Sequence, residues 1–183
     1  ALIYLYMLLL TTFVAIVQSF SISLGVGSST LAIVNFFVAI SDGKIDETER
    51  RMMGIVYVVL RIAMILILAT TVLLMIFDHL DAGIDMTSLV SAQLIVLIVL
   101  FLNATLMTMR KMPSTFGPAL QAGSWYTLGT LAALVPLGLT TFTLTEFFLG
   151  YVTWLILAIA IVNGVMAILK HKKQKQQAQT TTQ

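Results

Sequence analysis

The run from Arg51 to Phe77 constrains the fold more than any other stretch of this chain. It is apolar over more than the roughly 20 residues that a helix needs to cross a bilayer, yet Arg61 stands about midway along it. A charge at the bilayer centre costs about 2.5–3.5 kcal/mol on insertion scales. We therefore expect the chain to cross a membrane and to offset this cost with polar groups, water or a bound anion.

Composition excludes a soluble domain. The chain has 183 residues, of which 59% are hydrophobic and only 10% charged, and its mean hydropathy is +1.02. Soluble globular domains carry about 25% charged residues, so this chain has too few to cover a water-facing surface. Because it contains no cysteine, disulfides, thiolate metal sites and cysteine nucleophiles are also excluded.

The apolar runs predict an all-α fold, a polytopic membrane bundle of six transmembrane helices. The predicted spans are 2–22, 26–41, 51–77, 87–109, 118–142 and 147–169, followed by a disordered, basic and Gln-rich tail at 170–183. The first two spans are separated by glycines and hydroxyl residues at 25–30, which favour a turn. A turn there leaves only about 18 residues for each of the two spans, which is barely enough to cross the bilayer. A re-entrant element is therefore the alternative to a tight hairpin.

Local signals mark several helix ends. Asp46 and Glu49, and likewise Thr143 and Glu146, have the spacing of a capping box, so one helix should begin near residue 47 and another near residue 147. Pro118 suits the first turn of a helix. Pro136 removes a backbone donor, so we expect it to kink the fifth helix.

The basic residues predict the orientation. With six spans and both termini cytoplasmic, every basic residue except Arg61 lies on the inside: Lys44, Arg50, Arg51, Arg110, Lys111, Lys170, Lys172, Lys173 and Lys175. The outside loops then carry only acidic charges, Asp78, Asp81, Asp85 and Glu146. This pattern predicts an integral protein of the plasma (inner) membrane with both termini in the cytoplasm.

Six polar or amphipathic side chains converge on the inner half of the predicted bundle, and we take them as candidate substrate-binding residues: Asn35, Arg61, Asn103, Trp125, Tyr126 and Asn163. Interhelical hydrogen bonding alone explains any single amide, at about 0.6 kcal/mol each. Arg61 is harder to explain, because no acidic residue shares its predicted depth. Its partner should be a neutral protein group, water or an anionic ligand.

Two functions fit these residues. The first is a small transporter or channel-like protein that carries a small solute, anionic if Arg61 binds it, through a polar site near Arg61. The second is a non-catalytic membrane subunit or scaffold, in which the polar residues pack helices or bind a partner subunit or a second copy. A short match between Gly27–Leu31 and Gly123–Leu128 hints at a 3+3 inverted repeat, as in many transporters.

Other functions find little support in the sequence. Asp42, Lys44 and Asp46 alternate as in a calcium loop, but a lysine stands where a ligand is needed. His79 and His171 lie on opposite sides of the predicted membrane, and no hydrolase or phosphate-binding motif occurs. We therefore predict no enzyme activity, no metal and no cofactor. We expect the chain to contact the lipid bilayer and not to bind nucleic acid.

Overall fold

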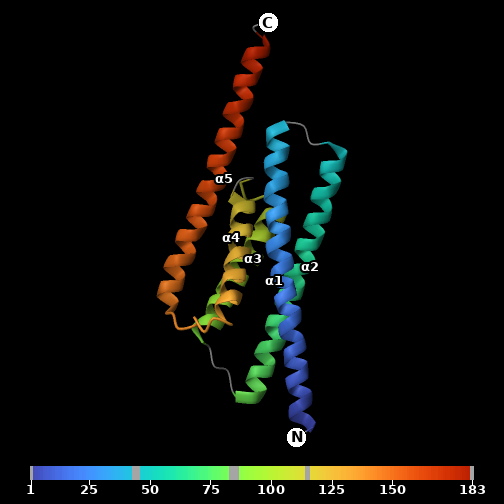
Figure 1. The fold of residues 1–183 in the computed structure, drawn as a ribbon, viewed down its shortest axis with the longest axis vertical. Helices are drawn as coiled ribbons and strands as arrows, with labels where there is room; N and C mark the ends of the chain where they lie inside the picture. The colour runs from blue at the N-terminus through green and yellow to red at the C-terminus, as the bar shows by residue number, and fades with distance from the viewer. Residues whose placement is uncertain (1, 43–45, 83–86, 114–115, 182–183) are drawn as a thin grey trace.

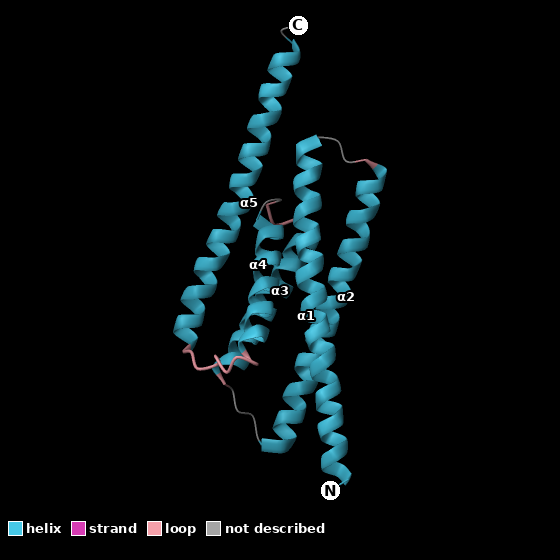
Figure 2. Ribbon diagram, viewed as in Figure 1, coloured by secondary structure: helices cyan, strands magenta, loops and turns pink. Residues whose placement is uncertain are grey.

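The computed structural model describes residues 2–42, 46–82, 87–113 and 116–181. These residues form five helices and no strand (Figure 2): α1 (Leu2–Asp42), α2 (Glu47–Ala82), α3 (Ser88–Thr108), α4 (Phe116–Leu134) and α5 (Leu144–Thr181). The predicted all-α fold is confirmed. Residues 43–45 of the loop considered for calcium, and Asp85 of the acidic loop, lie outside the described ranges.

Four of the helices are long and apolar enough to cross a membrane. The segments that qualify are Leu2–Val38 in α1, Glu47–Asp78 in α2, Ser88–Thr108 in α3 and Leu144–Leu169 in α5. This agrees with the prediction of a membrane protein. The remaining helix, α4, is less apolar because glycine, serine, threonine and glutamine interrupt its sequence.

The prediction of two separate spans at 2–22 and 26–41 is wrong, because α1 runs unbroken from Leu2 to Asp42. The hydroxyl residues expected in a turn bond to their own helix instead. Thr30 Oγ1 donates to the carbonyl of Val26 at 2.8 Å, and Ser29 Oγ donates to the same carbonyl at 3.0 Å. These back-bonds satisfy the hydroxyls within a helix.

Gly25 serves close packing in α1 rather than a turn. A Cβ atom built at this glycine would lie 2.2 Å from Cε3 of Trp125, so the absence of a side chain lets α4 approach α1. Small residues play this part at many helix interfaces in membranes. The same glycine therefore signals a turn in the sequence and a close contact in the fold.

The number of helices changes the topology. Five helices alternate in direction, so the N-terminus and the C-terminal end of α5 lie at opposite ends of the molecule (Figure 1). The six predicted spans are not confirmed, because the described residues form five helices, of which four are long and apolar enough to cross a membrane. The 3+3 repeat is not confirmed either, because residues 27–31 lie inside α1 and do not begin a helix.

Two predictions about helix ends also need correction. Helix α4 ends at Leu134 and not near residue 142, so Pro136 terminates the helix instead of kinking it. A turn follows, with Gly138 at a φ of 68°. At the other end of the chain, α5 continues to Thr181 through the tail predicted as disordered, since lysine, glutamine and alanine are good helix formers.

Both predicted capping boxes are confirmed. Before α2, the backbone N–H of Glu49 donates to Asp46 Oδ1 at 2.6 Å, and the N–H of Asp46 donates to Glu49 Oε2 at 3.1 Å. Before α5, the N–H of Thr143 donates to Glu146 Oε2 at 2.8 Å, and the N–H of Glu146 donates to Thr143 Oγ1 at 3.2 Å. Each reciprocal pair satisfies two backbone donors that the first turn leaves free.

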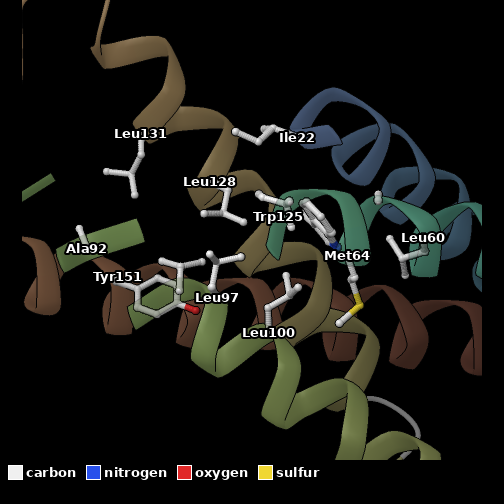
Figure 3. Close-up of a cluster of buried hydrophobic side chains, with 13 residues drawn as sticks. Ile22, Leu60, Met64, Ala92, Leu97, Leu100, Trp125, Leu128, Leu131 and Tyr151 are labelled. Carbon is white, nitrogen blue, oxygen red and sulfur yellow. The ribbon is translucent and has the colours of Figure 1, made fainter. Parts of the chain in front are cut away.

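The core forms around α4, which packs against α1, α3 and α5. Trp125 is fully buried within it, next to Leu128 of α4, Met64 of α2 and Leu100 of α3 (Figure 3). The outer faces of α1, α2 and α5 carry many exposed large apolar residues. This distribution is what a bilayer requires, since lipid and not water covers the apolar outer surface.

Candidate functional site

A pocket of about 250 Å³ lies where α1, α2, α3 and α4 meet. Arg61 lines it, together with Tyr57, Ser29, Thr108 and Gln121 as the other polar residues. The remaining lining is apolar and comes from all four helices. The pocket lies near the α3–α4 turn, because the end of α3 and the first turn of α4 both contribute to it.

Arg61 faces the pocket because of helical periodicity. Tyr57, Leu60, Arg61 and Met64 follow one another at spacings of three, one and three residues, so they share one face of α2. The arginine side chain is exposed. In the described part of the chain, no hydrogen bond or ion pair connects it to another residue. Its five donors therefore stay available to a ligand or to water.

Asn103 orients the side-chain amide of Gln121, which lines the pocket. This residue of α3 is 1% exposed, and its Nδ2 donates to Gln121 Oε1 and to the carbonyl of Gly117, each at 2.9 Å. Gln121 Nε2 in turn points at the sulfur of Met64, 3.5 Å away. A thioether is a weak acceptor, so a stronger acceptor entering the pocket would compete for this amide N–H.

Two buried polar atoms beside this cluster lack a hydrogen-bond partner among the described residues: Asn103 Oδ1 and Trp125 Nε1. Figure 3 shows the indole nitrogen of Trp125 on the side that faces Met64. Neither Asn103 nor Trp125 lines the pocket itself. Both lie behind the residues that line the pocket. Burying each polar atom without a hydrogen-bond partner costs about 1–3 kcal/mol.

The remaining candidates lie apart from this cluster. Asn35 is half-buried on α1, next to Phe36, which lines the pocket, but does not itself line it. Tyr126 faces α1 and α5, since its hydroxyl lies 2.7 Å from Thr30 Oγ1 and its ring packs edge-on against Trp154. Asn163 is exposed on α5. The structure thus brings Arg61 close to Asn103 through Gln121 and Met64, and leaves Tyr126 and Asn163 elsewhere.

Gln121 is the buried amide of the pocket that sequence reasoning missed. It stands four residues before Trp125 on α4, so both fall on the same helix face. The sequence contains this spacing, but a glutamine in the first turns of a membrane helix is expected to lie at the membrane–water interface. Its burial, with 6% of its surface exposed, becomes visible only when α2 and α3 close over it.

The pocket combines one cation, one amide and three hydroxyl groups with apolar walls. A guanidinium binds carboxylate or phosphate through two parallel hydrogen bonds, and the amide N–H of Gln121 offers a further donor. The described lining contains no acidic residue to compete for Arg61. This donor set suits a small anion, and the apolar lining suits an organic one.

Comparison with known proteins adds no family: no model of a protein family, no curated protein and no solved structure matched this chain significantly.

Proposed function

We propose that this chain is a small multi-pass membrane protein that binds a small organic anion at Arg61 and passes it across the bilayer. The observation that carries the proposal is an arginine within an apolar helix that lines a pocket and has no protein partner in the described chain. Ionisable residues inside membrane segments mark binding sites and pathways more often than they mark packing. A bound anion would offset the cost of placing the charge there.

We propose the orientation from the basic residues. The end of α1, the start of α2, the α3–α4 turn and the C-terminal part of α5 lie toward one end of the bundle (Figure 1). The basic residues other than Arg61 fall within these segments or next to them in the sequence. By the positive-inside rule this end faces the cytoplasm of the plasma (inner) membrane. We count α4 as a crossing beside the four apolar helices; with five crossings the C-terminus is cytoplasmic and the N-terminus lies outside, in place of the expectation from six spans.

Thermal unfolding in detergent tests anion binding. Chloride, phosphate, acetate and benzoate are titrated in turn, because a ligand that binds only the folded state raises its melting temperature. We expect benzoate or acetate to stabilise the wild type and to have no effect on Arg61→Met. Arg51→Met removes a cation from the same helix outside the pocket and should keep the response. Uptake of the bound anion by proteoliposomes then tests transport.

The scaffold function remains the second candidate, and the length of α1 favours it. Its apolar segment, Leu2–Val38, contains 37 residues and is about 55 Å long, whereas the hydrocarbon layer is about 30 Å thick. Leu2 and Tyr4 near its start are 85% and 77% exposed. A partner subunit or a second copy would cover this surplus. Three results together would favour the scaffold function over transport: Arg61→Met keeps full stability, the wild type binds no anion, and a partner co-purifies with it.

A further inference from the structure

A second and larger pocket lies between α4 and α5. Its volume is about 640 Å³, within the roughly 300–1,000 Å³ typical of small-molecule sites. It differs from the Arg61 pocket in chemistry, because five aromatic rings line it: Tyr126, Phe142, Phe147, Tyr151 and Trp154. None of the functions derived above uses this pocket.

Hydrogen bonds and stacking hold several of these rings in place. The hydroxyl of Tyr151 lies 2.8 Å from Ser124 Oγ, and Trp154 Nε1 donates to the carbonyl of Gly123 at 3.0 Å. Phe147 stacks on Tyr151 with ring centroids 5.6 Å apart and an interplanar angle of 15°. Rings fixed before a ligand arrives lose little conformational entropy on binding. The pocket is therefore preformed.

Glu146 supplies the only formal charge among the described residues that line the pocket. Its Oε2 accepts hydrogen bonds from the backbone N–H and the hydroxyl of Thr143, at 2.8 and 2.9 Å. Both bonds use the same oxygen, so Oε1 has no partner within the described chain. The capping box thus fixes the carboxylate at the mouth of the pocket and leaves one oxygen free.

We propose that this pocket binds a hydrophobic organic cation, such as a quaternary ammonium or phosphonium ion. The faces of aromatic rings attract cations, and the attraction increases where water is excluded. The carboxylate of Glu146 adds a negative charge that attracts a cation and repels an anion. A neutral lipid chain would fill the apolar walls but would gain nothing from the carboxylate. The ligand is therefore opposite in charge to the one proposed for Arg61.

Equilibrium binding of radiolabelled tetraphenylphosphonium to the full chain in detergent tests this inference. We expect saturable binding at one site, which Glu146→Gln weakens by about tenfold. Glutamine keeps an acceptor for the capping box, so the start of α5 is preserved. Asp78→Asn removes an acidic charge from a residue that lines a different pocket and should leave the affinity unchanged. Arg61→Met should also leave it unchanged, which separates this inference from the anion site.

Neutral triphenylphosphine oxide distinguishes a cation site from a merely apolar groove. We expect it to compete weakly and to be insensitive to Glu146→Gln. If the wild type shows no saturable binding, or if Glu146→Gln and Asp78→Asn bind tetraphenylphosphonium equally, the proposal is wrong. If Glu146→Gln does not fold, Phe147→Leu decides the question: loss of one ring should weaken binding by about threefold, and an unchanged affinity refutes the site.

Discussion

Replacing Gly25 with alanine probes the contact between α1 and α4 that shapes this fold. A methyl group there would lie 2.2, 2.3 and 2.5 Å from three ring carbons of Trp125, and that ring is 0% exposed. Neither the helix backbone nor the enclosed ring can move without disturbing the core. Such overpacking costs about 1–3 kcal/mol, and the better helix propensity of alanine offsets about 0.5–1 kcal/mol of it. The midpoints of the two ranges leave a net loss of about 1 kcal/mol of unfolding free energy.

Gly27→Ala is the matched control two residues along the same helix. Nothing lies within 4 Å of a Cβ atom built at Gly27, and the residue is exposed. Alanine should therefore stabilise the helix there by up to about 1 kcal/mol. Both variants are unfolded with sodium dodecyl sulfate in dodecyl maltoside micelles and followed by circular dichroism, which reports the free energy of unfolding.

A double variant identifies the clash itself. Leucine at position 125 lacks the three ring carbons, so Gly25→Ala should cost much less in a Trp125→Leu background than in the wild type. The reasoning fails if Gly25→Ala is as stable as the wild type. It also fails if Gly27→Ala is destabilised by more than about 1 kcal/mol, because a turn glycine with positive φ would give that sign.

Particular contacts lead to three further predictions. Arg110, just after the end of α3, has a φ of 55°, so Arg110→Gly should raise the unfolding free energy by about 1 kcal/mol in the same assay; a lower value would mean that the arginine side chain stabilises the turn. Asn103→Ala removes the 2.9 Å bond to Gln121 and should cost about 1–3 kcal/mol, whereas an unchanged stability would show that the amide cluster contributes nothing. The chain has no cysteine, so single cysteines at Ile3 and Lys172 can be labelled with an impermeant maleimide; five spans predict labelling from opposite faces of the membrane, and labelling from the same face would show an even number of spans and refute five.

The pocket around Arg61 shows how far sequence reasoning extends. Position along a helix can be counted from its ends, so the sequence alone predicts that Arg61 and Asn103 lie in the inner half of the bundle. The direction in which a side chain points around the helix axis depends on which helices are neighbours. For this reason Asn163, at a comparable predicted depth, is exposed on α5, whereas Gln121, which the sequence does not single out, lines the pocket.

The membrane class, the helical secondary structure and both capping boxes follow from the sequence alone, because hydropathy, helix length and reciprocal hydrogen bonds are local properties. The path of the chain through residues 25–30 does not. Glycines and hydroxyl residues suit a turn and also suit a tightly packed helix. In the fold, Gly25 lies within the continuous α1 and packs against the ring of Trp125, a neighbour that the sequence does not identify. Only the tertiary structure shows α1 as one helix in a bundle of five described helices, with the two termini at opposite ends (Figure 1).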